Sequence, residues 1–172
     1  MPWKLIKTQT VFDSYTKLEE QTYEMPDGQM KKFYIKVTQP AVCVMALTPD
    51  YQAILVEQFR PGPNTTLMEL PGGGVEEGET PEQAIARELR EETGYEGDIQ
   101  FVTQCFDDAY ATMNRHCFVA TNCKKVAEQQ LDDGEHIRVR CVQLDDFLAI
   151  VRSGQMTDVE VAYLGLDRLG LL

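Results

Sequence analysis

Three glutamates stand close together in the segment GETPEQAIARELREETG, residues 78–94. In a helix, Glu88, Glu91 and Glu92 would fall within an arc of about 100°, because an α-helix turns once in 3.6 residues. Like charges at this spacing destabilise a helix by roughly 0.2–0.5 kcal/mol per pair. Carboxylates are also ligands that Mg²⁺ takes in proteins, together with substrate phosphates and water. Arg87 precedes Glu91 by one turn and could partly neutralise it. The segment is therefore either a solvated acidic face or a cation-binding site.

The same segment carries strong signals for the two ends of a helix. Thr80 is a good N-cap, Pro81 suits the first helical position, and Gln83 can close a capping box with Thr80. Gly94 follows as a candidate left-handed C-cap. The sequence therefore predicts a helix over 81–93.

A longer pattern includes this helix and the residues just before it. The pattern is G-x5-E-x7-R-E-U-x-E-E-x-G-U, where U is a bulky apolar or aromatic residue, and the chain matches it without a gap. This is the signature of the Nudix hydrolases, and the chain resembles that family. The resemblance favours a cation site over a solvated face. The matched positions are Gly73, Glu79, Arg87, Glu88, Leu89, Glu91, Glu92, Gly94 and Tyr95.

The resemblance implies a metal-dependent enzyme that cleaves a nucleoside diphosphate linked to another group. Glu88, Glu91 and Glu92 would bind Mg²⁺, with Mn²⁺ as the alternative and two or more ions in all. The backbone carbonyl of Gly72 would complete a metal shell, and Arg87 would brace the glutamates. Glu88 is also the base in some members of the family.

Apolar runs and turn signals predict the other elements. The expected strands cover 41–47, 53–59, 98–106, 115–123 and 137–144, and a Pro-Asp-Gly turn at 26–28 predicts a hairpin. A helix in LDDFLAIVRSG is expected to end at Gly154, and TDVEVAYLGLDRL is expected to begin with a Thr157–Glu160 capping box. Strands, a central helix, more strands and a helical tail indicate a mixed α/β layered fold.

The resemblance makes the fold prediction more specific. It implies a Nudix-type α/β/α sandwich with a mixed sheet and an N-terminal β-hairpin region. We expect residues 1–172 to form a single Nudix hydrolase domain, with N-terminal strands over 1–40 and the core over 41–172.

Three stretches outside the signature resemble the ADP-ribose and nucleoside diphosphate sugar pyrophosphatase branch: VEQFRPG, MELPGGGVEEGE and SGQMTDVEVAYLGL. The branch implies that a nucleoside diphosphate sugar is split into a nucleoside monophosphate and a sugar phosphate. A glutamate in a loop ahead of a late strand often acts as the base, and GEHIRVR places Glu135 there. Asp133 is the alternative, and a plain solvated acid is an equal interpretation for either residue.

Two further residues are candidates for substrate binding. Arg60 offers a bidentate fork for a phosphate or a dimer contact, with a surface salt bridge as the alternative. Tyr110 stands where ADP-ribose enzymes usually have a proline; it could stack on a base or bond a phosphate, or be a half-buried aromatic at a strand edge. Tyrosines downstream of the signature occur in enzymes of dinucleoside polyphosphates. A hydrolase of nucleoside triphosphates or dinucleoside polyphosphates is therefore the alternative function, and a non-catalytic nucleotide-sugar-binding module is a minor one.

Composition and the resemblance together indicate the partners. The formal net charge of −12 opposes binding to nucleic acid phosphates. No apolar run approaches the ~20 residues that span a bilayer, and the N-terminus lacks the apolar stretch of a secretory signal. Five scattered cysteines disfavour a zinc site or a disulfide framework, and several of them sit in apolar runs that predict core positions. We expect a cytoplasmic protein without nucleic acid or membrane partners.

Because branch members are usually homodimers whose N-terminal strands complete the partner's site, we also expect a homodimer.

Overall fold

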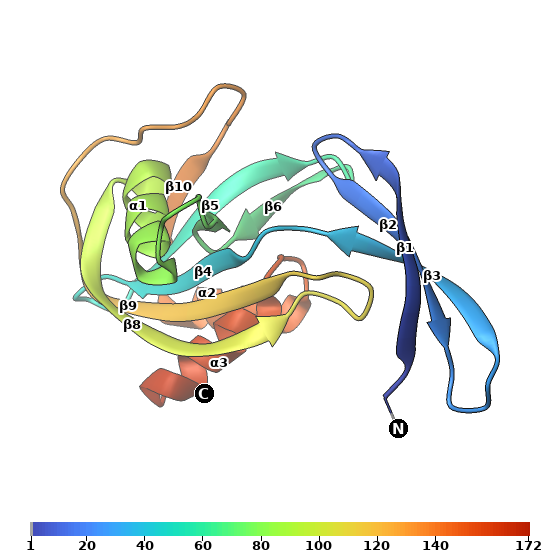
Figure 1. The fold of residues 1–172 in the computed structure, drawn as a ribbon. Helices are drawn as coiled ribbons and strands as arrows, with labels where there is room; N and C mark the ends of the chain where they lie inside the picture. The colour runs from blue at the N-terminus through green and yellow to red at the C-terminus, as the bar shows by residue number, and fades with distance from the viewer. Residues whose placement is uncertain (1) are drawn as a thin grey trace. The chain divides into compact units, whose positions relative to one another are not determined.

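The structure divides the chain into two compact units. It is a computed structural model that describes residues 2–172 (Figure 1). One unit contains the chain up to Pro40 and the segment Cys105–Arg115, and the other contains Ala41–Gln104 and His116–Leu172. The first boundary coincides with the expected division between N-terminal strands and core. The segment Cys105–Arg115 was not expected in the N-terminal unit, and the single domain stays a prediction.

The N-terminal unit is built on a three-stranded antiparallel sheet with the order β1-β2-β3. Its strands are β1 (Lys4–Asp13), β2 (Lys17–Glu24) and β3 (Met30–Val37). The predicted Pro-Asp-Gly turn joins β2 to β3. Gly28 has a φ of 82°, and its N–H donates to Met25 O at 2.9 Å. Because a positive φ is accessible to glycine without steric cost, the turn forms as the sequence predicts, and the hairpin region is confirmed.

The second unit contains most of a seven-stranded sheet with the order β10-β5-β4-β9-β8, in which β6 also pairs with β5 and β7 with β4. All five strands predicted in this part of the chain are confirmed, with ends that move by a few residues. The strands are β4 (Ala41–Leu47), β5 (Ala53–Arg60), β6 (Thr65–Glu69), β7 (Gly72–Gly74), β8 (Tyr95–Phe106), β9 (Asn114–Lys125) and β10 (Arg138–Val142).

Helices cover both faces of this sheet (Figure 1). Helix α1 (Pro81–Thr93) packs on one face, and α2 (Leu144–Ser153) and α3 (Val159–Leu169) lie on the other. Side chains alternate between the faces of a strand. Met45 of β4 lies against Gly165 of α3, where an added Cβ would clash with it. The alternate residues of β4 join α1 in one buried cluster that includes Val42, Val44, Ala46, Ala84, Ile85 and Leu89. The α/β/α sandwich is confirmed.

The start of α3 differs from the sequence prediction. The N-cap is Asp158, which has a left-handed φ of 57° and makes no side-chain capping hydrogen bond. The predicted Thr157–Glu160 capping box is therefore wrong. A capping box needs an N-cap in the extended region, so that its side chain can reach the N–H groups of the first turn. Here the chain enters the helix through a left-handed residue instead. The end of α2 at Gly154, with a φ of 67°, is confirmed.

The cysteines agree in part with the expected core positions. Cys43, Cys117 and Cys123 are buried, Cys105 is half-buried, and Cys141 is exposed on β10. No helix within residues 2–172 is both long enough and apolar enough to cross a membrane.

Candidate active site

Helix α1 presents the signature residues, and both of its ends form as the sequence predicts. The Thr80 hydroxyl accepts a hydrogen bond from Gln83 N at 3.3 Å, and the Gln83 side chain accepts one from Thr80 N at 2.9 Å. Gly94 has a φ of 77° and closes the C-terminus. Ile85 and Leu89 are fully buried against the sheet. Because these apolar residues fix the rotation of the helix, the side that bears the glutamates is directed toward the loop that follows β7.

Arg87 is the centre of a network of charges on this side of the helix. Its guanidinium donates to Glu79 at 3.0 and 3.1 Å, to Glu88 at 2.9 Å and to Glu91 at 3.1 Å. It also donates to the carbonyl of Gly74 at 3.1 Å. The bidentate hydrogen bonds that Arg87 donates to Glu79 hold the pKa of Glu79 below its usual value and raise the pKa of Arg87. Arg87 therefore ties the loop before α1 to two of the helix glutamates.

Glu92 is buried close to the network, and no ion pair to it forms within the described residues. Its side chain is 6% exposed, and its carboxylate accepts a hydrogen bond from Gly72 N at 2.9 Å. Burial raises the pKa of Glu92 to about 8; the Gly72 N–H opposes this rise, and the charges of Glu88 and Glu135 add to it. Because burial disfavours a charged carboxylate, this group would be stabilised by a nearby cation.

Glu88 occupies space that the absence of a side chain at Gly73 leaves open. A Cβ added at Gly73 would clash with the Glu88 carboxylate. Burial raises the pKa of Glu88, and its contacts with Arg87 partly oppose the rise. The glycine in the signature therefore has a steric reason at this position.

The expected metal ligands are partly brought together. Glu88 and Glu91 converge on Arg87, while Glu92 turns to the backbone of Gly72. Within residues 2–172, no three His, Cys, Asp or Glu side chains form a ready-made metal cage. The donor set nevertheless fits a hard divalent cation, which takes carboxylate and carbonyl oxygens, and no side chain in residues 2–172 forms an ion pair with the buried Glu92. The metal-binding roles stay predictions.

Glu135 lies in the loop before β10 and within electrostatic reach of the helix glutamates. Its charge contributes to the raised pKa values of both Glu88 and Glu92. The loop is held by a turn in which Glu135 N donates to Asp132 O, and Asp132 N donates to the Glu135 carboxylate, both at 3.0 Å. Asp133 is exposed in the same turn. The structure therefore brings Glu135 to the site, and its role as the base stays a prediction.

Arg60 forms an ion pair with a buried acid that sequence reasoning missed. The guanidinium of Arg60 donates to both oxygens of Glu69, at 2.7 and 2.5 Å, and Gln58 donates to the same carboxylate at 3.0 Å. Glu69 is only 2% exposed. Its position within the apolar run LMEL was the available signal, since a buried acid is almost always paired. Arg60 also interacts electrostatically with Glu92, so the Arg60–Glu69 ion pair lies near the helix glutamates.

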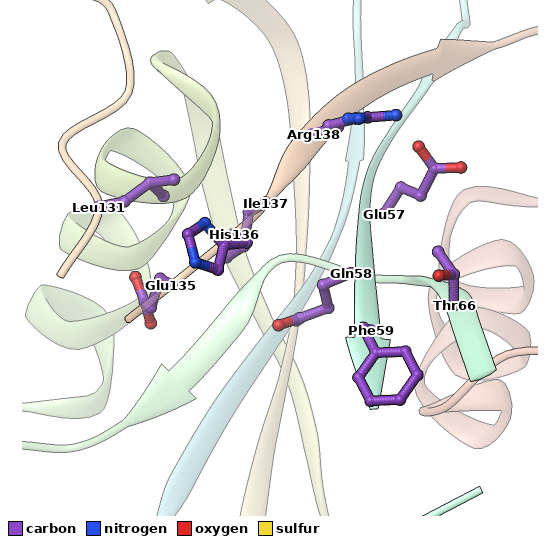
Figure 2. Close-up of a pocket in the computed structure, with 9 residues that line it drawn as sticks. All are labelled: Glu57, Gln58, Phe59, Thr66, Leu131, Glu135, His136, Ile137 and Arg138. Atoms are coloured by element: carbon purple, nitrogen blue, oxygen red, sulfur yellow. The ribbon is translucent and has the colours of Figure 1, made fainter. Parts of the chain in front are cut away.

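An open cavity of about 640 Å³ adjoins Glu135. In Figure 2 the side chain of Gln58 extends from β5 toward Glu135, and the ring of Phe59 lies farther along the same strand. The lining residues are Glu57, Gln58, Phe59, Thr66, Leu131, Glu135, His136, Ile137 and Arg138. The cavity therefore combines polar groups with an exposed aromatic ring beside a candidate base.

Tyr110 belongs to the N-terminal unit. Its ring stacks on Phe33, with centroids 6.2 Å apart and planes 19° apart, and it remains 56% exposed. Its carbonyl accepts a hydrogen bond from Lys36 N at 2.8 Å. The position is that of an exposed aromatic held on a small sheet, and substrate binding by Tyr110 stays a prediction.

Comparisons with known proteins identify the family. The NUDIX domain model matches residues 37–159. An ADP-ribose pyrophosphatase of Bacillus subtilis (strain 168) is 36% identical over 143 residues, which are 81% of this chain and 77% of that protein. A methanol dehydrogenase activator of Bacillus methanolicus is 33% identical over 175 residues, covering 95% of this chain and 93% of that protein.

The fold has a solved counterpart as well. The crystal structure of an ADP compounds hydrolase superposes with a TM-score of 0.80 at 18% identity, over 100% of this chain and 98% of that chain. At this identity the likeness shows the fold. Together with the complete signature in and around α1, the family model and the relatives show that the chain belongs to the Nudix hydrolase family.

Proposed function

We propose that the protein hydrolyses the pyrophosphate bond of a nucleoside diphosphate sugar, giving a nucleoside monophosphate and a sugar phosphate, in a metal-dependent reaction. The observation that carries the proposal is the intact acidic face of α1, where Arg87 organises Glu88 and Glu91 beside the buried Glu92. The relative from Bacillus subtilis is an ADP-ribose pyrophosphatase, which supports an ADP-ribose-like substrate.

Two or more ions of Mg²⁺ or Mn²⁺ would be held by Glu88, Glu91, Glu92 and the carbonyl of Gly72. Bound there, the ions would neutralise the pyrophosphate oxygens, lower the pKa of a water and stabilise the leaving phosphate. The protein's own contribution is to keep these carboxylates oriented. Arg87 does so with five hydrogen bonds to Glu79, Glu88, Glu91 and Gly74.

Glu135 is the best candidate for the general base, with Glu88 and Asp133 as alternatives. A base must lie within reach of the water that it deprotonates, and Glu135 reaches the site from a loop whose charge is felt by Glu88 and Glu92. No covalent intermediate is needed, since water is the nucleophile.

The cavity beside Glu135 would receive the part of the substrate that does not react. Its Phe59 ring is 56% exposed and offers a flat apolar surface. Arg60 would contact a phosphate while its pair with Glu69 holds it, and Tyr110 would contact the base or a phosphate. We further propose a cytoplasmic homodimer, to which the exposed apolar residues of β1, such as Leu5 and Phe12, contribute.

One observation favours a second function. Tyr110 is exposed and stacked on Phe33, as a base-stacking residue in a hydrolase of dinucleoside polyphosphates or nucleoside triphosphates would be. A non-catalytic nucleotide-sugar-binding module is less compatible with a full set of signature carboxylates.

A product assay on the purified protein tests these functions. The substrates are ADP-ribose, several ADP-, GDP- and UDP-sugars, a dinucleoside polyphosphate and the deoxynucleoside triphosphates, each with Mg²⁺ and with Mg²⁺ plus excess EDTA. We expect metal-dependent release of a nucleoside monophosphate and a sugar phosphate from at least one nucleotide sugar. Turnover of triphosphates or dinucleoside polyphosphates alone would replace the proposal with the second function. Binding without turnover, with Mn²⁺ also tried, would favour the module.

A further inference from the structure

The C-terminal end of α1 is closed by a segment distant in sequence. The last carbonyls of any helix lack partners within the helix. Here Val126 N donates to Gly94 O at 2.8 Å, and Gln130 N donates to Glu91 O, also at 2.8 Å. Residues 126–130 therefore run against the last turn of the helix that carries the glutamates.

One side chain in this segment reaches beyond the helix. The Nε2 group of Gln129 donates to Glu92 O at 2.6 Å and to Ile137 O at 3.3 Å. A primary amide has two N–H groups, and both are used. A single amide thus joins the last turn of α1 to the start of β10.

The link closes the base of the loop that carries Glu135. The chain leaves Gln129, passes through five consecutive exposed residues, 132–136, and returns at Ile137, which is 6% exposed. The turn between Asp132 and Glu135 holds the loop internally. Gln129 lies just before the loop, and its amide joins the point where the loop returns, Ile137, to Glu92 in the last turn of the helix.

We propose that Gln129 is a positioning residue for hydrolysis, which holds the Glu135 loop at a fixed distance from the glutamates of α1. The proposal rests on the proposed function, in which Glu135 is the general base. The competing explanation is a purely structural one, in which Gln129 only completes the hydrogen bonds at the end of the helix. The two explanations differ in whether the effect of losing the amide passes through Glu135.

The test is Gln129→Met, which keeps the length of the side chain and removes both donors. Gln130→Met is the matched control, because Gln130 is adjacent and exposed and bonds to the helix through its backbone. We expect kcat to fall on the order of 10- to 100-fold, the range for outer residues that orient reacting groups, with KM and Mg²⁺ affinity within about twofold of the wild type. If Gln129→Met does not fold, Gln129→Glu serves instead, since a carboxylate at neutral pH cannot donate.

A double-mutant cycle with Glu135→Gln separates positioning from structure. The effects of mutations at two residues that act through one another are not additive. Adding Gln129→Met to Glu135→Gln should therefore reduce kcat by less than about twofold. Amide hydrogen exchange of residues 132–136, measured on the metal-free protein, should quicken in Gln129→Met and not in Gln130→Met. An equal loss in both backgrounds, an unchanged kcat or unchanged exchange would overturn the proposal. A wild type that turns over no nucleotide sugar would instead overturn the proposed function, and the exchange comparison would still test the link.

Discussion

Two buried glutamates, Glu69 and Glu92, differ in the groups that stabilise their carboxylates. Glu69 is 2% exposed and receives three hydrogen bonds, two from the guanidinium of Arg60 and one from Gln58. Glu92 is 6% exposed, and the structure gives its carboxylate one hydrogen bond, from Gly72 N. Arg60 pairs directly with Glu69, whereas within residues 2–172 no ion pair reaches Glu92, and the charge of Arg60 acts on it only from a distance. The comparison indicates that Glu69 serves the architecture, and it supports the prediction that Glu92 binds a cation.

The largest effect is expected from Glu92→Gln. The amide keeps the shape of the side chain and removes a negative charge, so activity should fall by about 10²–10³-fold, as when an electrostatic stabiliser of a transition state is lost. Stability of the metal-free protein should not fall, because the lost charge is one that burial disfavours. Steady-state kinetics and urea unfolding measure the two effects. Glu82→Gln, at an exposed position of the same helix, is the control, and similar activity in the two variants would remove Glu92 from the site.

Arg60→Met, unlike Glu92→Gln, should destabilise the protein. It leaves Glu69 buried without its cation, which should cost about 3 kcal/mol of unfolding free energy, the low end for a broken buried pair because Arg60 is half-exposed. Arg140→Met is a suitable control, since Arg140 is about as exposed as Arg60 but pairs at 2.7 Å with Glu57, which is 22% exposed. Urea unfolding of Arg60→Met and Arg140→Met measures the two losses of unfolding free energy, and the first should be the larger. A rise in KM without destabilisation would make Arg60 a substrate residue rather than a structural one.

The contrast between these glutamates also predicts a pH effect. In the metal-free protein the pKa of Glu92 is raised from 4.5 to about 8. A carboxyl with a raised pKa in the folded state supports stability below the unfolded value and loses that support as pH rises through the folded value. The unfolding free energy of the wild type should therefore fall, relative to Glu92→Gln, between pH 4.5 and about 8. Urea unfolding in EDTA across this window measures the difference, and parallel curves for the two proteins would show that Glu92 does not titrate as expected.

Local and distant interactions explain which features the sequence could predict. The caps of α1 depend on residues within one turn of each helix end, so Thr80, Gln83 and Gly94 were sufficient to place it. The start of α3 could not be placed, because the left-handed backbone of Asp158 overrides the local Thr157 signal. The placement of the α1 glutamates on one side of the helix was also predicted, because it depends only on their spacing along the chain. In contrast, the pairing of Glu69 depends on the register of β5 and β6, and the Gln129 link depends on where β10 returns.

The smallest effect is expected at the start of α1, far from Glu92 along the helix. Thr80→Ala removes a capping hydrogen bond and should lower the unfolding free energy by about 1 kcal/mol. Activity should stay within about twofold of the wild type, because Ile85 and Leu89 keep the helix packed on the sheet and Gly72 still holds Glu92. Urea unfolding and steady-state kinetics on one preparation test both statements, with Thr80→Ser as the control that keeps the hydroxyl. If Thr80→Ala lost most of its activity while Thr80→Ser kept it, the cap would be positioning Glu79 and Arg87, and the site would depend on the start of the helix as much as on its buried end.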